Sequence, residues 1–161
     1  LLDLAHNTLL PYGLSRYGDD SKKHFEDLQK SFESLLKESK STFNFTKLIT
    51  ASEKLADAGN KCSMALQKAN PKYLSEINQR LIKLERMWID EGGMSYGKWH
   101  KSLYASSDPY SGYASWMMPA FHYELSLKNI ANLSNWENIY INVLQNLTNE
   151  LVALQKLALK K

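Results

Sequence analysis

The sequence holds four histidines and one cysteine, the residue types best suited to metal binding or nucleophilic catalysis. None of the histidines has the spacing of a His-Glu-x-x-His or cysteine–histidine zinc site; they stand far apart, at His6, His24, His100 and His122. Cys62 lies among alanines, which is typical of a buried structural thiol. There is no Gly-x-Ser-x-Gly motif and no glycine-rich phosphate loop. We therefore expect no catalytic site, metal or cofactor complete within this chain.

A second group of polar residues lies near the end of a helical pattern. Glu85 and Arg86 stand beside its apolar positions, and Asp90 follows one turn later. These residues form either a solvated face with a local ion pair, worth about 0–1 kcal/mol, or a contact from Arg86 to the aromatic segment that follows or to a neighbouring domain. The sequence leaves both interpretations open.

Three triplets match the Asn-x-Ser/Thr acceptor of N-glycosylation, at Asn44, Asn132 and Asn146. The first two fall near expected helix starts, and Asn146 falls within a helix. Together they favour a chain that passes through a secretory lumen.

Composition limits the class of protein. The chain has 161 residues, of which 43% are hydrophobic, and a formal net charge of +3. This length suits one globular domain. The small net charge argues against binding to nucleic acid or to a membrane surface. One cysteine excludes an internal disulfide. The sequence contains no run of about 18 apolar residues, so we expect no membrane span. The chain opens without a methionine or a signal peptide, which suggests a piece of a longer protein.

Apolar residues recur every three or four positions along most of the chain, a pattern that predicts helices. Ser21 is the expected cap of the first long helix, and the segment 47–69 forms the next, with a seam of small residues that allows close packing. Pro71 is expected to open a third helix that ends at about residue 90. The stripes that support these three helices are Phe25, Leu28, Phe32 and Leu35; Leu48, Ala51, Leu55, Ala58, Cys62, Ala65 and Ala69; and Leu74, Ile77, Leu81, Leu84 and Trp88.

Residues 93–118 break the helical pattern but are rich in aromatic side chains, so we expect an ordered loop rather than disorder. Pro119 opens a shorter helix, and Ser134 with Glu137 resembles a capping box for the last helix. The last helix is apolar on more sides than a surface helix needs. The expected fold is all-α: a four-helix-bundle-like domain with a long ordered aromatic loop between helices 3 and 4.

The segment Leu81–Asp90 resembles the Leu-Glu-Arg-(aromatic pair)-Asp helix end of the transferrin receptor and glutamate carboxypeptidase II family. The segments Trp99–Ser107 and Gly112–Ala114, followed by Pro119, continue the resemblance at the family's spacing. The opening residues 1–11 are similar to the helix that closes the family's peptidase-like domain.

This resemblance implies a type II membrane glycoprotein with its ectodomain on the lumenal or extracellular side, in the secretory pathway, a vacuole or at the cell surface. Residues 1–11 would end a peptidase-like domain of the zinc-dependent M28 type, and residues 12–161 would be the helical domain that mediates homodimerisation. The zinc ligands and catalytic glutamate of the carboxypeptidases lie in the upstream domain, so none can be assigned to a residue here.

Three functions follow from these observations. The first is homodimerisation through the last helix, for which the expected interface residues are Ile139, Val143, Leu147, Leu151 and Leu154. The second is a loop that completes a peptidase pocket, because Tyr113 matches the tyrosine of the family's substrate-binding Lys-Tyr pair, although Gly112 replaces the lysine. The third is a docking surface for a protein ligand in a pseudo-enzyme. The sequence has no Arg-Gly-Asp, so binding of transferrin is not expected.

Overall fold

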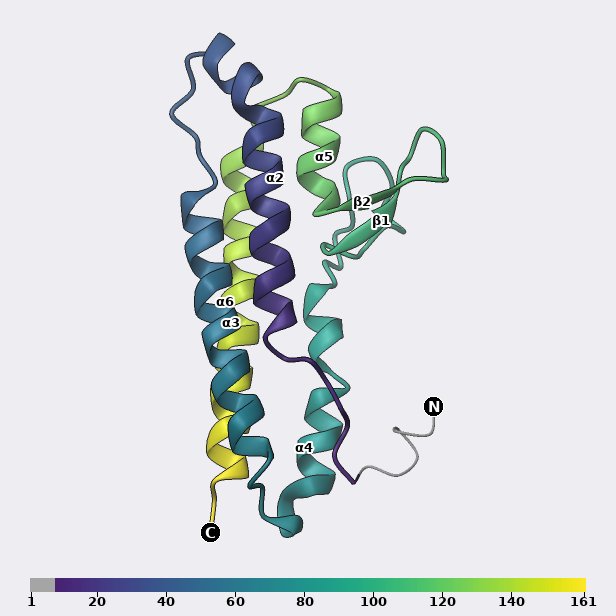
Figure 1. Ribbon diagram of the computed structural model, residues 1–161. Helices are drawn as coiled ribbons and strands as arrows, with labels where there is room; N and C mark the ends of the chain where they lie inside the picture. Colours follow the sequence, from purple (N-terminus) through teal and green to yellow (C-terminus); the bar gives the residue numbers. More distant parts are fainter. Residues whose placement is uncertain (1–7) are drawn as a thin grey trace.

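Three long helices form the centre of the computed structural model: α2 (Arg16–Glu38), α3 (Thr46–Leu66) and α6 (Leu133–Ala158). The helix α3 packs against both α2 and α6 (Figure 1). The structure describes residues 8–161, so the expectations for residues 1–7, including His6, lie outside it. The expected helical bundle is confirmed, with one small hairpin in addition.

A shorter helical column stands beside the three long helices (Figure 1). It consists of the 3-10 helix η1 (Pro71–Tyr73), α4 (Leu74–Leu81) and the 3-10 helix η2 (Leu84–Trp88). The sequence predicted one continuous helix here. The chain instead leaves the α-helix after Leu81, and the end of η2 pairs with the following loop, where the Leu103 amide donates to the Trp88 carbonyl at 2.7 Å.

The aromatic loop is ordered and contains a two-stranded antiparallel hairpin, β1 (Ala105–Ser107) and β2 (Ser115–Met117). These strands were not predicted, because segments of three residues carry too little alternation to be recognised. The helix α5 (Pro119–Ser126) follows the hairpin and packs against α2 and α6. In Figure 1 the hairpin projects to one side of the bundle, next to α5.

An aromatic cluster fills the core where α2, α3, α5 and α6 meet. The ring of Phe121 lies 5.0 Å from that of Phe45 and 5.2 Å from that of Tyr140. Phe25 meets Tyr140 edge-on at 5.7 Å. All four side chains are fully buried, and such offset or edge-to-face pairs are worth about 0.5–1.5 kcal/mol each beyond their burial.

Two glycines outside the predicted α3 seam allow close backbone packing. A Cβ on Gly18 of α2 would lie 2.2 Å from the backbone nitrogen of Ala56, and a Cβ on Gly59 would lie 2.5 Å from the carbonyl oxygen of Leu14. Only glycine permits these backbone approaches, which bring α2 and its preceding turn directly onto α3.

Two expected helix caps were wrong. The helix α2 begins at Arg16, and Ser21 lies inside it, donating its hydroxyl hydrogen bond to the Tyr17 carbonyl at 2.6 Å. The helix α6 begins at Leu133, so Ser134 is not its cap, and Glu137 forms no capping box. Instead, the buried Glu137 carboxylate accepts from the Lys47 ammonium group at 3.1 Å.

Across residues 8–161, none of the helices combines the length and the apolar character needed to span a bilayer.

Candidate interaction surface

The apolar side chains expected at the dimer interface lie in the core of the chain itself. Leu147, Leu151 and Leu154 are fully buried, and Val143 is almost so. Ile139 is half-buried and borders the surface. The wide apolar stripe of α6 is explained by the chain's own helices, which cover it from several sides. The four buried residues are therefore not available to a second copy while the bundle is folded.

The outer side of α6 is almost free of charge. Its 26 residues include three charged ones, whereas the 23 residues of α2 include eleven. Of the two acids in α6, Glu137 pairs with Lys47, and Glu150 accepts two hydrogen bonds from Arg80 at 2.6 and 2.9 Å. The remaining charge, Lys156, lies in the last turn of the helix.

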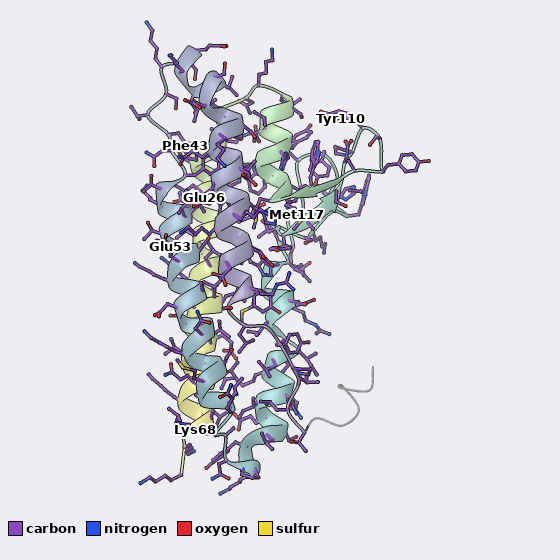
Figure 2. All side chains as sticks on the ribbon, in the orientation of Figure 1. Glu26, Phe43, Glu53, Lys68, Tyr110 and Met117 are labelled. Atoms are coloured by element: carbon purple, nitrogen blue, oxygen red, sulfur yellow. The ribbon has the colours of Figure 1, made fainter. Side chains whose placement is uncertain are left out.

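Six exposed amide side chains cover this outer side, and we call them the α6 amide face: Asn135, Asn138, Asn142, Gln145, Asn146 and Asn149. At 100° per residue they occupy about 100° of the helix surface, and they extend over about 21 Å. By contrast, α2 and α3 present charged side chains such as Glu26 and Glu53 to solvent (Figure 2). A charge-depleted patch on an otherwise charged protein is typical of a protein–protein interface.

A groove between α3 and α6 adjoins the amide face. It has a volume of about 510 Å³. Ala51 of α3 and Ile141 of α6 supply apolar lining, and Gln145 and Asn149 of the amide face line it as well. From α3, Lys47 and Lys54 add positive charge to the groove. The groove therefore joins apolar area to the neutral polar face. This surface was missed in the sequence analysis, although counting the charges at the outer positions of the last helix would have found it.

The three glycosylation acceptors are exposed. The Asn44 side chain accepts from the Thr46 amide at 3.0 Å, and Asn132 donates to the carboxylate of Glu124 at 3.0 Å. Asn146 belongs to the α6 amide face. A glycan on Asn146 and a partner chain on the same face would therefore exclude each other.

Tyr113 lies at the tip of the hairpin and is 98% exposed. The turn that carries it is held by Asp108, which accepts from the Tyr110 amide and the Ser111 hydroxyl, both at 2.7 Å. The Ser111 hydroxyl and then the Tyr110 amide lower the pKa of Asp108 below its usual range. Gly112 adopts a left-handed φ of 72°. The exposed Tyr113 ring is thus free to contact another molecule.

The remaining sequence candidates are not brought together into a metal site among residues 8–161. Cys62 is buried, and burial raises the pKa of its thiol to about 11. His100 lies 3.3 Å from the Ser106 hydroxyl. Burial lowers the pKa of His24 and of His122, and the nearby His24 lowers that of His122 further.

The charged residues at the end of η2 do not form a common cluster. Glu85 and Arg86 are exposed, and Asp90 accepts from the Gly92 amide at 2.8 Å to close a turn. Glu85 faces Tyr17 of α2 rather than the aromatic loop. A different carboxylate, Glu124, is buried and was missed in the sequence; Trp136 Nε1 donates to it at 3.2 Å.

Residues 8–161 thus form a helical bundle whose last helix has a charge-poor outer face. Residues 23–152 match the family of transferrin receptor-like dimerisation domains, and the chain belongs to this family. A comparison with curated proteins gives no match. The family is one of dimerisation domains rather than catalytic domains. The match begins at residue 23, so the domain boundary expected between residues 11 and 12 stays a prediction.

Proposed function

We propose that this domain forms a homodimer through the α6 amide face and the adjoining α3–α6 groove. The observation that carries the proposal is the charge depletion of this surface, since both acids of α6 are paired within the chain. Dimers with two-fold symmetry use the same patch on both copies. The amide face is compatible with its own copy, because it brings no like charges together. The groove also contains two lysines of α3: Lys47, which pairs with Glu137, and Lys54.

The size of the surface decides which elements must take part. A strip about 21 Å long and 10–12 Å wide, the diameter of one helix, covers about 200–250 Å². A standard interface buries about 800 Å² per partner. The α6 amide face alone is therefore too small, and the groove with its α3 wall has to be included. Ile139, at the border of the face, remains an expected contact.

Sedimentation equilibrium of the 161-residue chain over a range of concentrations tests the proposal. The wild type is expected to approach twice its mass of 18.5 kDa. Gln145→Arg places one positive charge per copy in the interface and should shift the equilibrium to monomer. Gln29→Arg is the matched control, because Gln29 is exposed on the charged α2.

Association of Gln145→Arg at the wild-type concentration would place the interface elsewhere. Substituting Leu147 and Leu151 with aspartate is not a suitable test, since both side chains are core residues and the fold itself would be lost.

For the longer protein we propose a membrane glycoprotein of the transferrin receptor or glutamate carboxypeptidase type, with this domain on the lumenal or extracellular side. Any zinc would belong to its upstream peptidase-like domain. The exposed acceptors Asn44 and Asn132 support a secretory location, whereas Asn146 would carry no glycan in the proposed homodimer, because it lies on the amide face. A loss of mass on glycosidase treatment, after expression through a secretory pathway, tests this; no loss from the wild type would count against it.

A second candidate function is substrate or protein-ligand contact by the hairpin tip. The exposure of Tyr113 favours it, because nothing in the described chain covers the ring. In the full-length protein, Tyr113→Phe is expected to raise KM for a peptide substrate. A change in ligand-protein affinity without peptide turnover would favour the docking role. If neither the affinity nor the turnover changes, Tyr113 contacts neither a substrate nor a protein ligand.

A further inference from the structure

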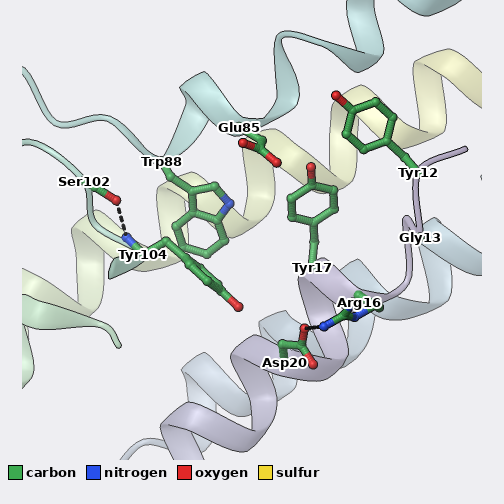
Figure 3. Close-up of a pocket in the computed structure, with 9 residues that line it drawn as sticks. All are labelled: Tyr12, Gly13, Arg16, Tyr17, Asp20, Glu85, Trp88, Ser102 and Tyr104. Atoms are coloured by element: carbon green, nitrogen blue, oxygen red, sulfur yellow. Dashed lines mark hydrogen bonds and ion pairs between the residues drawn. The ribbon is translucent and has the colours of Figure 1, made fainter. Parts of the chain in front are cut away.

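A pocket of about 360 Å³ lies between the start of α2, η2 and the loop that follows η2 (Figure 3). Its volume is at the lower end of the range for ligand-binding pockets. Four aromatic side chains line it: Tyr12, Tyr17, Trp88 and Tyr104. The backbone holds two of them in place, because the Leu103 amide donates to the Trp88 carbonyl at 2.7 Å. The rings of Trp88 and Tyr104 then meet edge-on at 5.1 Å.

The indole nitrogen of Trp88 is an unfilled hydrogen-bond donor in this pocket. The Trp88 side chain is only 4% exposed, and its Nε1 atom has no acceptor among the described residues. Figure 3 shows this nitrogen directed into the space between Glu85 and Tyr17. Buried donors in folded proteins nearly always have a partner. The nitrogen itself exposes less than 1 Å², so an acceptor from outside the described chain reaches it only after the exposed Glu85 side chain beside it moves.

The charges of the pocket favour a cation. Arg16 and Asp20 neutralise each other at 3.1 Å, whereas Glu85 forms no ion pair with residues 8–161. One negative charge is therefore in excess, next to several aromatic ring faces. Burial, and then the charge of Glu85, raise the pKa of Tyr17 to about 12, so its ring remains neutral at physiological pH.

We propose that this pocket binds an arginine side chain presented by a peptide segment of a partner protein. The guanidinium group would bond to the Glu85 carboxylate and lie on the ring faces of Tyr17 and Tyr104, and a main-chain carbonyl beside it would accept from Trp88 Nε1. Arginine suits the site better than lysine, because its planar group both stacks on aromatic rings and bonds to a carboxylate through two N–H groups. The proposal is independent of dimerisation.

The test uses N-acetyl-arginine methylamide as the probe and the indole N–H resonance of Trp88 as the readout. The resonance is assigned from its loss in Trp88→Phe, or from its proximity to the Tyr104 ring if that variant does not fold. Titration should move the resonance downfield as the carbonyl accepts from it. The citrulline analogue has nearly the same shape without the charge, and it should bind about tenfold more weakly.

Glu85→Gln should weaken arginine binding about as much as the change to citrulline does. Glu33→Gln, at an exposed position of α2 outside the pocket, should leave it unchanged. Equal affinity for the arginine and citrulline probes would overturn the proposal, because the charge would then play no part. An indole resonance that stays in place at saturating probe concentration, or wild-type affinity in Glu85→Gln, would do the same.

Discussion

Replacing Tyr140 with phenylalanine tests whether one hydrogen bond holds the aromatic loop onto the bundle. The Tyr140 hydroxyl donates to the Leu103 carbonyl at 2.7 Å, between groups 37 residues apart. Tyr140 is 0% exposed, and the phenylalanine ring would keep the contacts to Phe25 and Phe121. The substitution therefore removes the hydrogen bond with little change in packing.

The expected loss of stability comes from the Leu103 carbonyl, which has no donor once the Tyr140 hydroxyl is removed. A buried acceptor without its donor costs about 1–3 kcal/mol. For a domain of this size, a loss of about 2 kcal/mol lowers Tm by about 4–8 °C. Calorimetry should show this decrease for Tyr140→Phe. Tyr113→Phe, the same change at an exposed ring, should leave Tm within about 1 °C. Equal Tm values for the two variants would refute the assignment of a structural role to this bond.

Three further predictions concern Gly18, Cys62 and His122. Gly18→Ala should destabilise the fold by about 1–3 kcal/mol in urea unfolding, since a Cβ there meets the α3 backbone at 2.2 Å; a stabilised variant would mean that the helices separate easily. Cys62 should react with a thiol reagent only after unfolding, because its pKa is raised to about 11 and its side chain is buried; rapid labelling of the native chain would contradict its burial. His122 has a folded pKa below the usual 6.5. As pH falls through 6.5 the unfolded state binds the proton first, so the folded state loses stability. This loss should be smaller in His122→Asn, and an identical pH profile of stability would exclude the role of His122.

The helical part of the fold was predictable because its signal is local. Leucine and phenylalanine at spacings of three and four mark one face of each helix, and the buried residues Phe25, Leu55 and Leu144 all come from such stripes. The small residues of the α3 stripe predicted a close neighbour, but the contact with α2 forms at Gly18, which lay outside that stripe. These features depend on residues within one or two turns of each other.

The errors involve residues that are distant in sequence. Glu137 has the spacing of a capping box, but its partner is Lys47, 90 residues away. The width of the apolar stripe on α6 indicated burial on two sides, but a stripe alone does not distinguish a second copy from the chain's own helices. The unfilled Trp88 donor likewise becomes visible only when α2 and η2 are placed together.

The position of α6 at the end of the described chain has a consequence for synthesis. This helix covers the aromatic cluster and also bonds to distant segments, through Glu137 to Lys47 and through Glu150 to Arg80. During translation, Phe25, Phe45 and Phe121 emerge well before the helix that buries them. The domain therefore completes its fold only after α6 (Leu133–Ala158) has left the ribosome. Until then the nascent chain exposes its most aggregation-prone surface, and a stop codon before residue 133 would leave that surface permanently uncovered.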